Sequence, residues 1–197
     1  MSHLALKDTL RHLREAGGVV LDRLSDLTGY AAIRVPLRKA GRPGEVTLDL
    51  TGYRQINTYC CGAVASAMIV KYLRPQVSFE RIHAAVNPLP ETGAGNLRVT
   101  RALRSLGIKV SRSTRLTFAG LCAAIDAGHP VLLCVKTDDL SVDHWVVVYG
   151  YGRRPNLVFV AGNGPLLIAR QRMSWRNFRQ QWSPPGMGWV CSKAGRN

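Results

Sequence analysis

The spacing of apolar residues changes along the chain and separates an N-terminal part from a central domain. Leucine and valine recur at roughly helical intervals over residues 3–28, which predicts one or two helices. Residues 33–46 are rich in proline, glycine and charge, which indicates a loop or linker. Residues 45–50 alternate between polar and apolar side chains as a strand does. We therefore expect a helical extension and linker over residues 1–45 and one compact domain over residues 46–197.

Beyond residue 60, patterns typical of helices come before patterns typical of strands. Residues 61–73 form an unbroken run of small and apolar side chains, which predicts a buried helix. Ser78 precedes a second helical pattern as its cap, and Gly107 closes a third. The further helices are expected at residues 78–86, 96–107, 117–128 and 173–182, and the strands at residues 108–113, 129–136, 143–151 and 156–162. Helices first and strands later favour an α+β fold with an antiparallel sheet.

Composition places the chain among folded globular proteins. It has 197 residues, of which 46% are hydrophobic, so it forms one domain with an ordinary core and is not a disordered chain. No apolar run approaches the roughly 20 residues that span a membrane. The amphipathic, charged N-terminus lacks the apolar core and cleavage site of a secretory signal. We therefore expect a protein that is made in the cytoplasm and has no membrane partner.

The charge balance is strongly basic. Lysine and arginine number 27 against 12 acidic residues, which gives a formal net charge of +15. The basic residues are spread along the chain and form neither an arginine-rich block nor a zinc finger, so the pattern does not favour nucleic acid as a partner. It suits docking of an acidic protein better.

The five cysteines direct attention to one pair. They stand at positions 60, 61, 122, 134 and 191 and form no Cys-x-x-Cys motif, which argues against a zinc cluster or a redox dithiol. We expect no metal and no organic cofactor. Cys122 and Cys134 lie in apolar segments and are assigned to the core, the commonest position of a free cysteine. Cys60 and Cys61 remain as candidates for chemistry.

Cys61 has the surroundings that a nucleophilic thiol needs. It begins the small-residue helix, and the partial positive charge at a helix N-terminus lowers a thiol pKa. Gly62 follows and leaves room for a substrate to approach the sulfur. Gln55 lies six positions earlier, so we expect its amide and the Cys61 backbone N–H to form an oxyanion hole. Cys60 is the alternative nucleophile, but it lacks both the following glycine and this spacing.

His144 and Asn163 complete the candidate site. His144 opens the strand HWVVVYGY and is the expected general base, and Asn163 ends the next strand as the residue that orients the imidazole. The two strand ends meet only if the turn between them is short or crosses back, and both arrangements stay open. Asp143 is the alternative orienting residue, although adjacent residues on a strand face opposite ways. His83 and His129 are assigned to surface or structural positions.

The stretch QINTYCCGAVASAMIVKYL resembles the active-site segment of papain-like cysteine peptidases. It is most similar to the branch that processes bacteriocin precursors with a double-glycine leader, in which a glutamine stands six positions before Cys-Gly and a small-residue helix follows. Four later segments are similar to that branch in the same order: TGAGNLRVTRALRSLGIKV, HPVLLCVK, HWVVVYGY and MSWRNFRQQW. The resemblance covers about residues 50–185.

This resemblance implies a papain-like cysteine peptidase fold, with a helical left lobe that carries Cys61 and an antiparallel right lobe that carries His144 and Asn163. It also implies hydrolysis of a peptide bond in a protein substrate: Cys61 attacks the carbonyl, His144 transfers the proton, and Gln55 helps to bind the oxyanion. Two positions depart from the branch. Cys60 stands where the branch has an acidic residue, and Asn163 stands where it has aspartate.

Processing peptidases of that branch are usually fused to a membrane transporter, and this chain contains no membrane segment. We therefore expect a bacterial effector or toxin peptidase that a secretion system delivers into the cytoplasm of a target cell and that an acidic immunity protein inhibits. Three alternatives stay open. They are a leader-processing peptidase, a transglutaminase, deamidase or acyltransferase with the same triad, and a catalytically inactive binding module.

Overall fold

The computed structural model describes most of the chain from residue 32 onward. The described residues are 32–35, 37–55, 57–137, 140–162 and 171–195. The helices expected within residues 3–28 lie outside these ranges, and so does Asn163. Among the described helices, none combines the length and the apolar character that crossing a membrane requires.

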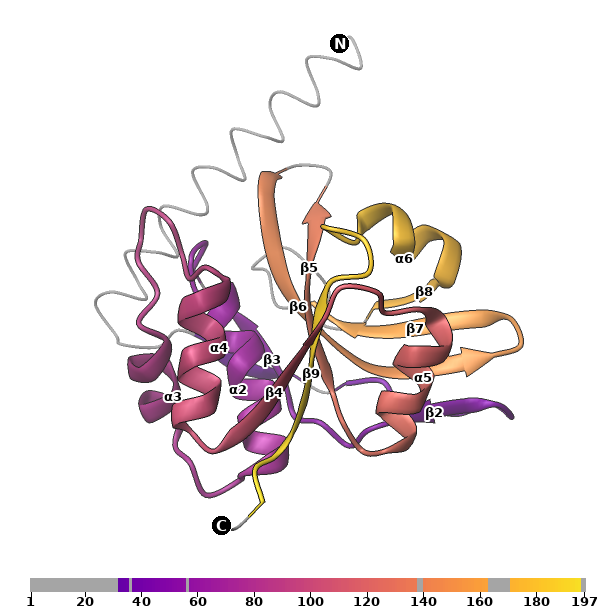
Figure 1. The fold of residues 1–197 in the computed structure, drawn as a ribbon, viewed down its shortest axis with the longest axis horizontal. Helices are drawn as coiled ribbons and strands as arrows, with labels where there is room; N and C mark the ends of the chain where they lie inside the picture. The colour runs from indigo at the N-terminus through magenta and orange to yellow at the C-terminus, as the bar shows by residue number, and fades with distance from the viewer. Residues whose placement is uncertain (1–31, 36, 56, 138–139, 163–170, 196–197) are drawn as a thin grey trace, which may run out of the picture.

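Three helices form one lobe. The helix predicted from the small-residue run is α2 (Cys61–Leu73), and it lies beside α3 (Phe79–Val86) and α4 (Asn96–Ser105) (Figure 1). Residues 62–70 are all buried, because α3 and α4 cover one side of α2 and the sheet covers another. Side chains as small as glycine, alanine and serine let several elements approach the same helix closely.

The predicted ends of two helices are confirmed by their geometry. The hydroxyl of Ser78 caps α3 by accepting the backbone N–H of Arg81 at 3.2 Å. Gly107, just after α4, has a φ of +77°, in the left-handed region that favours glycine.

An antiparallel sheet forms the second lobe, which confirms the predicted α+β class. Among the described residues it has seven strands, in the order β4–β9–β5–β6–β7–β8, with β2 pairing with β6 outside this path. The strands are β2 (Glu45–Thr47), β4 (Ile108–Ser113), β5 (Val131–Thr137), β6 (Leu140–Arg153), β7 (Asn156–Ala161), β8 (Gln171–Ser174) and β9 (Gly188–Lys193).

Both faces of this sheet are buried. Trp145, Val147 and Tyr149 of β6 share a core with α2, whereas Val146 and Val148 share a core with the helices on the opposite face. Those helices are α5 (Phe118–Asp126) and α6 (Trp175–Gln181). The long strand β6 therefore carries side chains into both cores and joins the two lobes.

The core around α6 is aromatic, and the core assignment of two cysteines is confirmed. Trp175, Phe178 and Trp182 pack together around α6, with ring centroids 5.3–6.0 Å apart. Cys122 and Cys134 are buried.

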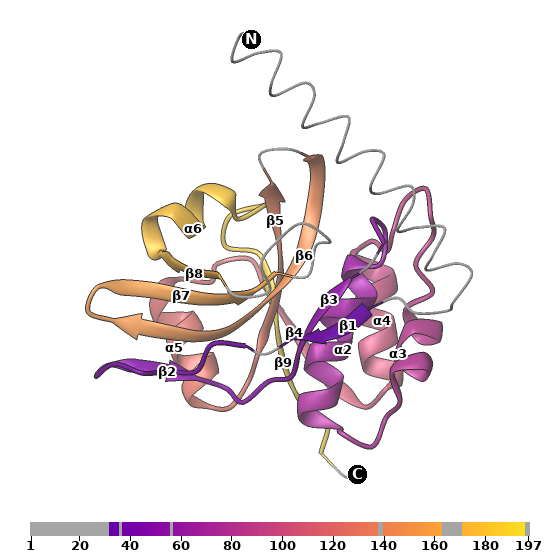
Figure 2. The same cartoon turned by 180° about the vertical axis from the view of Figure 1, so that it is seen from behind.

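Four short strands are missing from the sequence-based prediction. β1 (Ala32–Val35) lies within a stretch predicted as a loop, yet it pairs with β3 (Gly52–Gln55) in a small sheet beside α2 (Figure 2). β8 precedes α6. β9 follows α6 and inserts between β4 and β5, so the last described element of the chain is a strand and not a helix. These strands depend on partners remote in the sequence, and a local pattern does not carry that information.

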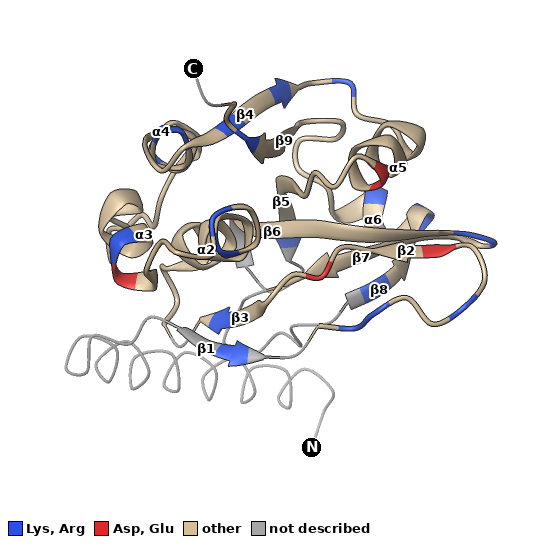
Figure 3. Ribbon diagram, turned by 90° about the horizontal axis from the view of Figure 1, so that it is seen from below, with Lys and Arg blue, Asp and Glu red and all other residues tan. Residues whose placement is uncertain are grey.

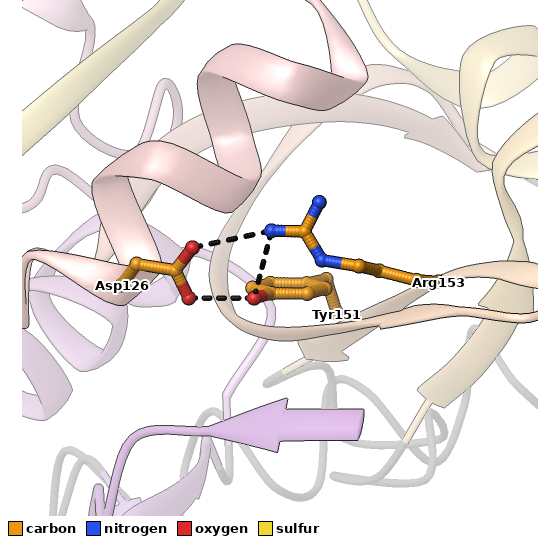
Figure 4. Close-up of polar contacts among 3 residues, drawn as sticks. All are labelled: Asp126, Tyr151 and Arg153. Carbon is orange, nitrogen blue, oxygen red and sulfur yellow. Dashed lines mark hydrogen bonds and ion pairs between the residues drawn. The ribbon is translucent and has the colours of Figure 1, made fainter. Parts of the chain in front are cut away.

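A polar cluster ties the far end of β6 to α5. Tyr151 is only 3% exposed, and its hydroxyl donates to the Asp126 carboxylate at 2.6 Å (Figure 4). Arg153 lies 3.3 Å from the same carboxylate and donates to the Tyr151 hydroxyl at 3.2 Å. Burial raises the pKa of Tyr151, and so does its hydrogen bond to Asp126, because a phenolate there would face a second negative charge.

Tyr151→Phe is expected to lower the free energy of unfolding by about 1–3 kcal/mol near neutral pH, because the buried hydroxyl bonds a charged partner. The raised pKa means that this contribution is complete below the ordinary pKa of 10.0 and is lost as the pH rises through the folded-state value. Urea unfolding at a series of pH values should therefore show a difference between wild type and variant that shrinks in the alkaline range. A difference that stays constant at high pH would contradict this account.

Candidate active site

Cys61 is the first residue of α2 and its side chain is partly exposed. The structure gives Gly62, the residue that follows, a packing role that the sequence did not predict. A Cβ atom at Gly62 would lie 2.9 Å from Cγ2 of Val99 and 3.3 Å from Cδ1 of Trp145. The absence of a side chain therefore allows the start of α2 to lie directly against α4 and β6.

β6 brings His144 to the same place. The backbone N–H of Trp145 donates to the Cys61 thiol, so the sulfur lies against the peptide unit that joins His144 to Trp145. His144 is 7% exposed while Asp143 is exposed, which confirms that these neighbours face opposite ways. Because β6 begins at Leu140, His144 lies within the strand and does not open it.

Trp145 connects this part of β6 to the helical lobe. Its indole Nε1 donates to the backbone carbonyl of Ala94, in the loop before α4, at 2.8 Å, and the bond is buried. Its ring lies 5.2 Å from the ring of Trp189 on β9. One side chain thus contacts the start of α2, the loop before α4 and the middle of the sheet.

The expectation of a lowered thiol pKa at Cys61 is wrong. Burial raises the pKa of the Cys61 thiol above its ordinary value, and the N–H groups of Trp145, Gly62 and Cys61 itself oppose this effect without outweighing it. Removing a thiolate from water costs more than the start of the helix returns. Without a further positive charge the thiol is protonated at neutral pH, so this nucleophile needs a base beside it.

Gln55 ends β3 and is 1% exposed. Its side-chain Nε2 donates to the backbone carbonyl of Asn57 at 2.7 Å. A carbonyl only accepts, so this contact fixes which end of the amide is the donor, and it leaves the second N–H of Nε2 for another acceptor. Asn57 itself was not singled out in the sequence.

The two adjacent cysteines have opposite surroundings. Cys60 is fully buried, with its thiol against Asn57 and His83 inside the helical lobe, whereas Cys61 is partly exposed. Of the two residues, only Cys61 is partly accessible from solvent. His83, assigned to a surface or structural position, is half-buried against this inner thiol.

The position expected for Asn163 follows β7. β6 and β7 form a tight antiparallel hairpin, with Arg153 opposite Asn156 and Val147 opposite Ala161. The turn is short, so the end of β7 lies beside Val147, three residues along β6 from His144. A short turn is one of the two arrangements that the sequence left open, and Asn163 itself lies outside the described residues.

Basic residues are spread over both lobes, and a groove lies on the outer side of the helical lobe, with none of the described candidate site residues in its lining. Figure 3 shows lysine and arginine on helices and strands of both lobes. The groove, of about 860 Å³, runs between the end of α3 and α4 and is lined by Arg98, Arg101 and Leu97, which is 67% exposed. In the part of the chain that the structure covers, no three His, Cys, Asp or Glu side chains are grouped to hold a metal ion.

Several solved structures share this fold. The peptidase domain of Streptococcus ComA, a bifunctional ABC transporter in a quorum-sensing pathway, has a TM-score of 0.57 at 23% identity over 71% of this chain and 96% of that one. A double glycine motif protease from an AMS/PCAT transporter, in complex with the leader peptide, has a TM-score of 0.56 at 15% identity over 75% and 94%. A putative C39-like peptidase from Bacillus anthracis has a TM-score of 0.52 at 17% identity over 70% and 90%.

A search of curated proteins found no match. The family model described as Peptidase C39 matches residues 51–194, which is most of the chain. Together with the shared fold, this match confirms the predicted resemblance to double-glycine processing peptidases and the papain-like α+β architecture. The chain therefore belongs to the Peptidase C39 family and is a cysteine peptidase.

Proposed function

We propose that this peptidase removes leader segments from precursor peptides by cleaving after a double glycine. The observation that carries the proposal is the thiol of Cys61, a partly exposed residue, lying against the peptide unit between His144 and Trp145, within a chain of the Peptidase C39 family. The structural likeness to a double glycine motif protease in complex with a leader peptide supports this substrate class. An effector role and an acidic inhibitor remain predictions from the sequence alone.

The proposed reaction follows from the protonation state of the site. His144 removes the proton from Cys61, which burial otherwise keeps on the sulfur, and the thiolate attacks the carbonyl carbon of the scissile bond. The imidazolium then gives this proton to the leaving amine. Water, activated by the same imidazole, releases the leader from the thioester.

Two further residues support this cycle in the proposal. Gln55 donates its second N–H to the oxyanion together with the backbone N–H of Cys61. Asn163, which comes two residues after the end of β7 in the sequence, orients the imidazole. No metal takes part in any step.

A synthetic precursor whose leader ends in Gly-Gly should be cut after the second glycine by the purified protein, as measured by mass spectrometry. Cys61→Ala should abolish cleavage. Cys122→Ala is the matched control, because it removes a buried thiol that packs with Tyr151, toward the other end of β6 from His144. Replacing Gly-Gly with Ala-Ala in the peptide should slow the cleavage. Cleavage that persists in Cys61→Ala would exclude this nucleophile, and a protein that cuts no such precursor would exclude this substrate class.

His144→Ala should slow alkylation of Cys61 by iodoacetamide at pH 7 by about 10-fold or more, since each pKa unit changes the thiolate fraction about tenfold. Burial raises the pKa of Cys61, so without the imidazolium the alkylation rate should rise only at alkaline pH, above the ordinary thiol value of 9.0. Stopped-time labelling and peptide mapping across the pH range measure this. Identical profiles for wild type and His144→Ala would remove His144 from the site.

Gln55→Ala should reduce kcat by roughly 10²–10³-fold, the usual effect of losing one oxyanion donor, and should leave KM nearly unchanged. Steady-state cleavage of the Gly-Gly precursor gives both constants. If kcat fell less than about threefold, Gln55 would not be an oxyanion donor.

A further inference from the structure

The residue before the candidate nucleophile makes a cysteine–histidine contact that the reaction proposed above does not use. The Sγ atom of Cys60 lies 3.3 Å from Nε2 of His83 on α3. Cys60 is fully buried, so no substrate reaches its sulfur. This pair therefore has a different function from that of Cys61 and His144.

Asn57 joins this inner contact to the proposed oxyanion donor. Its Oδ1 accepts the backbone N–H of Cys60 at 2.9 Å, and its Nδ2 donates to the Cys60 sulfur at 3.0 Å. Its backbone carbonyl accepts the Gln55 amide. These three bonds hold both ends of the turn between β3 and α2. Gln55 and Cys61, whose N–H groups are proposed to bind the oxyanion, lie at those two ends.

His83 anchors this turn to α3. Its ring stacks on Phe79, with centroids 6.4 Å apart and planes at 22°, and the Phe79 ring lies 5.6 Å from that of Tyr53 on β3. α3 thus supports the turn through the thiol of Cys60 and supports β3, which carries Gln55, through an aromatic contact. Burial lowers the pKa of His83, so the ring is neutral near pH 7 and puts no charge beside the thiol.

We infer that His83 and Asn57 are positioning residues for the oxyanion hole, acting through Cys60. The inference rests on the roles proposed for Cys61 and Gln55. Without the nitrogen of His83 the turn is held at fewer points, and the N–H groups at its two ends no longer converge on one position. The oxyanion then loses stabilisation, whereas access to the Cys61 sulfur does not change.

Two small reagents that react at Cys61 separate these effects, whatever the natural substrate is. Iodoacetamide alkylates the sulfur by direct displacement and forms no oxyanion. p-Nitrophenyl acetate acylates it through a tetrahedral oxyanion: the S–C bond forms, the ester C–O bond breaks, p-nitrophenolate leaves, and the thiol proton passes to His144. The ratio of acylation rate to alkylation rate therefore reports on the oxyanion hole.

His83→Phe keeps a ring that stacks on Phe79 but removes Nε2. It is expected to lower the acylation rate about 10-fold, less than the loss of a donor itself, while alkylation stays within about twofold. His83→Gln, whose Nε2 reaches a similar position, should restore most of the acylation rate. Asn57→Ser should lower the ratio as His83→Phe does, and His129→Phe, in the turn before β5, should change neither rate.

Equal losses of acylation and alkylation in His83→Phe would mean that the contact only maintains the fold, and unchanged rates would mean that it does not position the turn. Either result overturns the inference. A wild-type protein that p-nitrophenyl acetate does not acylate at Cys61 overturns it as well. If instead the ratio falls in His83→Phe but the wild type cuts no Gly-Gly precursor, the positioning role stands and the proposed substrate class fails.

Discussion

The contact between the first turn of α2 and Trp145 of β6 is the constraint on which the candidate site depends. Cys61 belongs to a helical lobe and His144 to a sheet, so their side chains meet only if these two units are fixed to each other. A glycine at 62 removes the atoms that would hold them apart, and the buried bond from the Trp145 indole to Ala94 joins the lobes at the same point. Loss of such a bond leaves a buried carbonyl unpaired, at a cost of about 1–3 kcal/mol.

Close packing and nucleophile reactivity oppose each other at this position. The contacts that align Cys61 also remove its sulfur from water, and that raises its pKa. Backbone N–H groups from both lobes recover only part of the stability of the thiolate. The remainder has to come from proton transfer to a neighbouring base, so the chemistry depends on a pair of side chains and not on an intrinsically acidic thiol. Exposure distinguishes Cys61 from Cys60, whose thiol lies 3.3 Å from a ring nitrogen of His83 but is fully buried.

The sequence predicts well those features that are local. The limits of α2 follow from its unbroken run of small residues, and the cap of α3 follows from Ser78, because both signals lie within one turn of the element they define. The pairing of β1 with β3 and the contact between Cys60 and His83 join distant segments, and no periodic pattern announces them. The sign of the Cys61 pKa shift was missed for a related reason, since burial is a property of the assembled lobes.

The position of β9 also determines when the two lobes can be completed. This strand lies between β4 and β5, so both of its neighbours in the sheet are made long before it. It carries Trp189, whose ring packs against Trp145. Synthesis proceeds at about 5–20 residues per second, so Cys61 and His144 are made seconds before β9. Until β9 is in place, the ring of Trp145 lacks its contact with Trp189. The nascent chain therefore carries Cys61 and His144 before the two lobes are fully joined, and the site is completed only after β9 inserts between β4 and β5.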